Sequence, residues 1–130
     1  MIRSVLAIVA GYVVAGLLTV LATMASASIV GPTPPRSYVW MNLLYSGVFA
    51  FVGGYVAATM APRKPLNHAL ILAGIMLVAG AAYALGGPRG ELPAREPDWY
   101  PWLLVVVAPA LVVLGGWIRE RAARRQHPQA

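Results

Sequence analysis

Four long apolar stretches alternate with short polar segments along the chain. They cover about residues 4–30, 38–61, 66–86 and 99–118, and each reaches the roughly 20 residues that a helix needs to cross a bilayer. Prolines interrupt the chain between them, and successive prolines stop a helix because they lack an amide donor. The pattern predicts an all-α membrane protein, an antiparallel up-down bundle of four transmembrane helices that forms one domain over residues 1–130.

Small residues recur at every fourth position in the first two apolar stretches. On a helix this spacing places them on one face, where a second helix can approach closely. In lipid the hydrophobic effect does not drive helices together, so their association depends on the van der Waals contacts that such close approach allows. We therefore predict that the helices pack through the small residues Gly11, Ala15, Ser46, Ala50, Gly53, Gly54 and Ala58.

The first apolar stretch also has features of a secretory signal peptide. Arg3 precedes the apolar run, and Ala25-Ser26-Ala27 resembles the small-residue cleavage site of such peptides. The run before Ala25 is longer than the roughly 7–15 apolar residues of a typical signal core. We interpret this stretch as the first spanning helix.

Composition and charge agree with a membrane protein. Of the 130 residues, 59% are hydrophobic and 11% are charged, which is outside the range of ordinary soluble domains. The net charge of +6 does not indicate a nucleic-acid partner, because the basic residues gather at the ends of the apolar stretches. The chain has no cysteine, which excludes disulfides and thiolate chemistry.

The basic residues are divided unequally between the two sides of the predicted bundle. Seven of them fall on the side of the chain termini and three on the other side. The side that is richer in Lys and Arg is normally cytoplasmic, so we expect both termini in the cytoplasm. The segment 119–130 should form a basic tail that contacts anionic lipid through Arg119, Arg121, Arg124 and Arg125.

The spanning stretches offer little chemistry. They contain no carboxylate and no lysine, so they lack a general acid or base, and we do not expect an enzyme. His68 lies in the first turn of the third expected helix, where an imidazole could ligate haem or a chlorophyll-type pigment. Its place beside Arg63 and Lys64 favours a solvated residue among lipid headgroups instead, and no further ligands accompany it. We expect no cofactor, with pigment binding at His68 as the alternative.

Several segments resemble a family of small, uncharacterised bacterial integral membrane proteins with four helices. The resemblance covers most of the chain and implies a multi-pass protein of the bacterial inner membrane. It depends on packing and interface residues, so it implies no activity. The matching segments are Arg3-Ser4-Val5-Leu6-Ala7, Gly11-Tyr12-Val13-Val14, Asn42-Leu43-Leu44-Tyr45, Gly53-Gly54-Tyr55-Val56-Ala57, Ala61-Pro62, His68-Ala69-Leu70, Pro97-Asp98-Trp99-Tyr100 and Leu114-Gly115-Gly116-Trp117-Ile118-Arg119.

These observations favour a non-enzymatic role in the membrane. We expect a structural or interaction protein, either an accessory subunit of a larger membrane complex or a homo-oligomer. Its partners would be the lipid bilayer and other membrane-protein subunits or further copies of itself. The alternative is a small oligomeric channel or transporter for an ion or small solute, with Asn42, Tyr45 and Pro109 around a narrow polar path. At Asn42 a hydrogen bond to another helix is favoured over such a path.

Overall fold

The protein is all helical. A computed structural model of the chain describes residues 2–31, 35–86 and 97–126, and no strand occurs among them. The helices are α1 (Ile2–Val30), α2 (Ser37–Met60), α3 (Pro65–Gly86) and α4 (Tyr100–Gln126). Each of the four is long and apolar enough to cross a membrane. The predicted fold class, an all-α protein with four spanning helices, is confirmed.

The helix ends agree with the predicted ones to within two residues, except at the end of α4. This helix continues to Gln126, eight residues beyond the predicted end of the span at Ile118. The additional turns add about 12 Å of helix and carry the basic residues of the predicted tail. Most of the connection between the third and fourth predicted helices, residues 87–96, and the last four residues of the tail lie outside the described residues.

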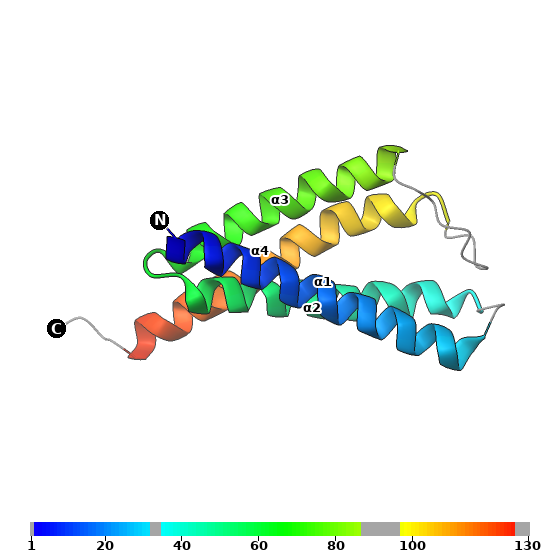
Figure 1. Cartoon of the computed structure of the whole chain (residues 1–130), viewed down its shortest axis with the longest axis horizontal. Coiled ribbons are helices and arrows are strands. Elements are labelled where there is room, and N and C mark those ends of the chain that lie inside the picture. The colour runs from blue at the N-terminus through cyan, green and yellow to red at the C-terminus, as the bar shows by residue number, and fades with distance from the viewer. Residues whose placement is uncertain (1, 32–34, 87–96, 127–130) are drawn as a thin grey trace.

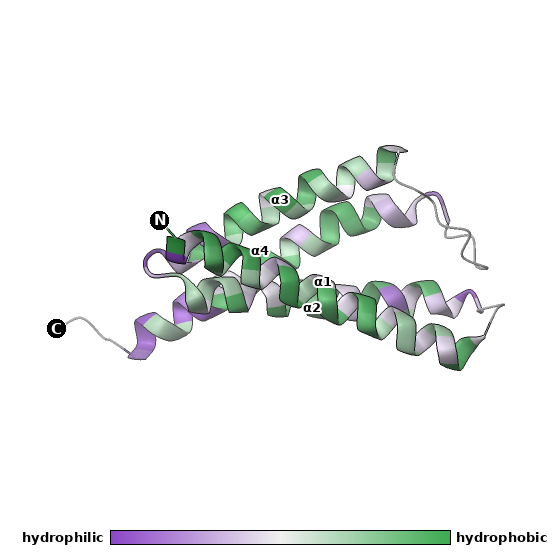
Figure 2. Cartoon of the chain, in the orientation of Figure 1, coloured by the Kyte–Doolittle hydropathy of each residue, from purple (hydrophilic) through white to green (hydrophobic). Residues whose placement is uncertain are grey.

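The helices form two pairs that are joined at the centre of the molecule (Figure 1). α1 packs against α2, α3 packs against α4, and the contact between α2 and α4 joins the pairs. The start of α1, the α2–α3 connection and the end of α4 lie together, and we call this the basic end. The opposite end, where α1 ends and α4 begins, is the aromatic end. Apolar residues cover the helices along most of their length, and polar residues gather at the basic end (Figure 2).

The backbones of α2 and α4 touch each other where the two helices cross. A Cβ atom added at Gly54 would collide with the backbone carbonyl of Val112 in α4. In the same way, a Cβ atom at Gly115 would collide with the backbone carbonyl of Phe51 in α2. Only glycine allows this approach, so each helix provides a glycine for the backbone of the other.

The other two helix pairs also meet at glycines. A Cβ atom at Gly11 of α1 would lie 2.6 Å from the carbonyl oxygen of Gly53, and the reverse distance is also 2.6 Å, so these two backbones touch. Between α3 and α4, the side-chain Cβ of Ala69 occupies the space that a Cβ at Gly116 would need. Dispersion at these close contacts holds all three pairs together.

The side chains that separate α2 from α4 become larger toward the aromatic end. Gly47 of α2 lies against Leu111 of α4, a Cβ added at Gly47 being 2.8 Å from a Leu111 methyl carbon. Nearer the aromatic end Tyr100 reaches α2 through its hydroxyl. At the end itself the rings of Trp40 and Trp99 lie 5.5 Å apart. This increase in size accounts for the divergence of the two helix pairs in Figure 1.

The small residues predicted at helix contacts all lie inside the chain's own bundle. Each of them is buried between helices, and together they account for much of the interior. The chain therefore uses its small-residue faces for intramolecular packing. The seven residues are Gly11, Ala15, Ser46, Ala50, Gly53, Gly54 and Ala58.

The backbone contact can be tested with two Gly→Ala variants. We expect Gly54→Ala to lower the thermal unfolding temperature of the purified protein in detergent, because its methyl group must displace the Val112 carbonyl. Gly16→Ala is the matched control, since nothing lies within 4 Å of a Cβ at that position. It should leave the unfolding temperature unchanged or raise it slightly, as Ala favours a helix over Gly by about 1 kcal/mol. Equal unfolding temperatures for the two variants would contradict the proposed role of Gly54.

Candidate functional site

A cleft lies between the two helix pairs and is the main candidate for a binding site. Its volume is about 380 Å³, and all four helices line it, with residues from 12–20, 46–50, 76–83 and 101–108. Near the basic end α1 meets α3, where Leu72 packs against Gly11. Toward the aromatic end the two helices separate, and α1 does not approach α4 closely. The cleft is therefore open to the side, between α1 and α3.

Four hydroxyl groups are the polar side chains of this cleft, and two of them are already satisfied. Thr19 donates a hydrogen bond to the carbonyl oxygen of Ala15 at 2.8 Å, and Ser46 donates to Oδ1 of Asn42 at 3.1 Å. Tyr12 and Tyr83 are exposed, and their hydroxyls form no hydrogen bond within the described part of the chain. The rest of the lining is apolar. The cleft can therefore hold an apolar molecule, and it brings no acid or base toward one.

Asn42 connects α2 to α4 beside the cleft. Its Oδ1 accepts a hydrogen bond from the Tyr100 hydroxyl at 2.8 Å, in addition to the one from Ser46. Asn42 thus forms the hydrogen bond between helices that its position in the sequence favours. Bonds of this kind in membrane proteins contribute on average about 0.6 kcal/mol.

The three residues predicted around a polar path lie at different helix contacts. Asn42 faces α4, whereas the Tyr45 hydroxyl is 3.0 Å from the Thr23 hydroxyl of α1. Pro109 is buried in α4, beyond the part of that helix that lines the cleft. The structure does not bring these residues around one path within the chain.

His68 is buried, and the expectation of a solvated residue at the lipid headgroups is wrong. Its side chain is 8% exposed, and Nδ1 lies 3.2 Å from the carbonyl oxygen of Lys64. The reason is the helix register, because His68 stands one turn before the buried Leu72 and shares its face. Within residues 2–31, 35–86 and 97–126, no group of three His, Asp or Glu side chains is placed to hold a metal ion.

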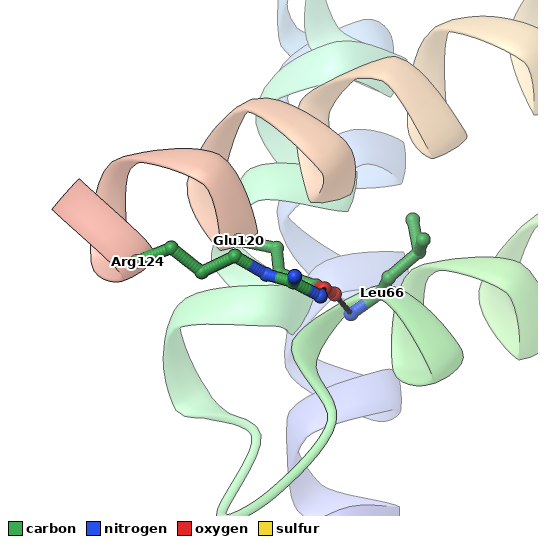
Figure 3. Close-up of polar contacts among 3 residues, drawn as sticks. All are labelled: Leu66, Glu120 and Arg124. Atoms are coloured by element: carbon green, nitrogen blue, oxygen red, sulfur yellow. Dashed lines mark hydrogen bonds and ion pairs between the residues drawn. The ribbon is translucent and has the colours of Figure 1, made fainter. Parts of the chain in front are cut away.

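At the basic end, Glu120 of α4 caps the first turn of α3 (Figure 3). One carboxylate oxygen accepts a hydrogen bond from the backbone N–H of Leu66 at 3.1 Å, and the other accepts one from Arg124. The first N–H groups of a helix have no acceptor within the helix, so this carboxylate satisfies one of them. The hydrogen bond from Arg124 lowers the pKa of Glu120, burial opposes this change, and the Leu66 N–H adds to it. No local pattern in the sequence indicates this contact, because Leu66 and Glu120 are 54 positions apart.

Three of the four arginines predicted to bind lipid also contact other parts of the chain. Arg119 donates through Nε to the Thr59 hydroxyl of α2 at 3.2 Å. The guanidinium of Arg121 lies 5.0 Å from the centre of the Trp117 ring, and Arg124 forms an ion pair with Glu120. Arg125 is exposed. The Arg119 hydrogen bond links the extension of α4 to α2, whereas the contacts of Arg121 and Arg124 lie within α4.

Comparisons of the chain with protein-family models, with curated proteins and with solved structures gave no match. The resemblance to small bacterial membrane proteins stays an expectation from the sequence.

The role of Glu120 predicts a particular dependence of stability on pH. Because the pKa of this carboxyl is lower in the folded protein, its contribution is present at neutral pH and is lost as the pH falls below the ordinary carboxyl range. We expect Glu120→Gln to lower the unfolding temperature in detergent at neutral pH. The difference from the unmodified protein should narrow as the pH falls through the lowered pKa of Glu120, because below it both side chains are uncharged. A difference that stays constant over this range would exclude a role for the charge.

Proposed function

We propose that this protein acts by binding within the membrane, as a non-enzymatic accessory subunit of a larger complex or as a homo-oligomer. The observation that supports this proposal is a second groove, of about 500 Å³, on the surface of the α2–α4 pair. Residues of α2 and α4 alone line it, and all of them are apolar. Neither α1 nor α3 contributes to it, so it lies outside the chain's own four-helix packing.

The geometry of this groove suits a further transmembrane helix. The groove follows α2 from Trp40 to Phe51, about 16 Å, which is half of the roughly 30 Å hydrocarbon core. The backbone contacts at Gly54 and Gly115 hold its two walls in place. Helices in lipid associate by fitting their side chains into such grooves, and one added helix would contact α2 and α4 at once.

A cross-linking experiment tests this proposal, and the absence of native cysteines makes it direct. Val48→Cys places a thiol in the groove, and Val78→Cys places one on the exposed surface of α3; the two valines are 50% and 68% exposed. Each variant is coupled to a maleimide-diazirine reagent in native membranes and illuminated. We expect protein adducts from position 48 and few from position 78. Adducts of doubled mass would identify a homo-oligomer, and adducts with another protein would identify the complex.

Two results would contradict the proposal. One is the absence of protein adducts at position 48, and the other is an equal yield at both positions. The alternative function, a channel or transporter, would require a path between copies, because α2 and α4 meet backbone to backbone at the centre of a single chain. Doubled adducts together with ion flux in vesicles would favour that alternative.

We further propose that the basic end faces the cytoplasm of a bacterial cell. Among the described residues this end carries seven Lys and Arg residues, and the aromatic end carries Arg36. The prediction is tested with Ser37→Cys at the aromatic end and Gln126→Cys at the basic end, neither of which changes the charge. In intact cells a membrane-impermeant thiol reagent should label position 37 and not position 126. Labelling of position 126 alone would reverse the orientation.

A further inference from the structure

We propose that the cleft between the two helix pairs binds the hydrocarbon chain of a single membrane lipid, which enters between α1 and α3. This inference does not depend on the proposed protein partner, because the cleft and the groove on α2 and α4 share no lining residue. It begins from the length of the cleft. Along α1 the cleft extends from Tyr12 to Val20, which is about 12 Å of helix around the middle of α1. One leaflet of hydrocarbon is about 15 Å thick, so the cleft is long enough to hold most of the length of one acyl chain.

The enclosure of the cleft favours a lipid chain over a helix as its occupant. The cleft runs along about 12 Å of α1, and residues of all four helices line it. Because walls from all four helices bound the cleft, a helix could enter only if α1 and α3 moved apart. A single extended chain fits without such a movement.

Hydrogen bonds between helices fix the walls of the cleft. The Tyr100 hydroxyl donates to Oδ1 of Asn42 at 2.8 Å and so ties α4 to α2. The Tyr45 hydroxyl lies 3.0 Å from the Thr23 hydroxyl and so ties α2 to α1. An empty cleft of this size would leave its lining side chains without dispersion contacts on one side. Lipid is the molecule present at high concentration where the cleft opens.

The polar side chains of the cleft favour a lipid whose headgroup lies at the aromatic end. The hydroxyls of Thr19 and Ser46 donate to acceptors of the chain itself, so they present no free donor to the occupant. Tyr83 lines the cleft three residues before the end of α3 at Gly86. Its hydroxyl has no partner among the described residues, and it can donate to an ester carbonyl at the headgroup boundary.

Photolabelling of the complete chain in vesicles tests the inference. The vesicles contain phosphatidylethanolamine and phosphatidylglycerol, with a trace of phosphatidylglycerol that carries a diazirine in one acyl chain. After illumination, mass spectrometry locates the labelled residues. Met76 and Ala79 line the cleft, whereas their neighbours Leu77 and Val78 do not, although 47% and 68% of these two side chains are exposed. We expect several-fold more label on the first two residues than on the second two.

Two glycines provide a matched pair of variants. Nothing lies within 4 Å of a Cβ atom at Gly16 or at Gly74, but only Gly16 lines the cleft. We expect Gly16→Leu to reduce the label on Met76 and Ala79 several-fold, and Gly74→Leu to leave it unchanged. If Gly16→Leu does not fold, Ala79→Leu fills the cleft from α3, and the label on Met76 is then measured.

Three results would overturn the inference. The first is labelling that follows exposure and favours Leu77 and Val78. The second is cleft labelling that remains after the cleft is filled. The third is the absence of lipid label on Met76 and Ala79, which would show that an acyl chain does not enter the cleft. None of these results bears on the proposed protein partner, which the cross-linking experiment at position 48 tests separately.

Discussion

The backbone contact between α2 and α4 is the constraint on which the rest of the molecule depends. Two glycines, Gly54 and Gly115, each receive a carbonyl of the opposite helix, at Val112 and Phe51. This contact fixes where the central helices cross and how close their axes lie. α1 then packs on α2, and α3 packs on α4, so each outer helix takes its position from the central pair. In lipid this arrangement is stabilised by dispersion between well-fitted surfaces, since hydrocarbon solvates an apolar side chain as well as a neighbouring helix does.

The change in side-chain size along the helices makes the two helix pairs diverge from this crossing. Near the basic half of the bundle, Gly and Ala allow backbones to touch, whereas tyrosine and tryptophan occupy the contacts at the aromatic end. The helix pairs therefore diverge toward the aromatic end, because the large side chains there keep them apart. The hydrogen bonds of Tyr45 and Tyr100 satisfy the polar atoms of these large side chains. The cleft is a consequence of this gradient and needs no separate explanation.

Much of the fold could be predicted because its signals are local. Apolar length predicts the four spans, and fourfold spacing predicts which faces of α1 and α2 are buried. Local spacing indicates that the small-residue faces of α1 and α2 can meet but not at which register, so the pairing of Gly11 with Gly53 and the cleft itself were not predictable. The burial of His68 depends on the rotation of α3, and neighbouring basic residues gave the wrong indication. Glu120 caps a helix 54 positions earlier in the chain, and no capping pattern in the sequence covers such a separation.

That same separation has a consequence for how the protein is made. The ribosome adds about 5–20 residues per second, so roughly 3–11 s pass between synthesis of Leu66 and of Glu120. During this interval α1, α2 and α3 can enter the membrane, while the first turn of α3 lacks its acceptor. α4 then brings both the glycines that meet α2 and the carboxylate that completes α3. α4, which is made after the three helices before it, therefore locks them in place, and a chain cut before α4 would lack both the Glu120 acceptor of α3 and the glycine that meets α2.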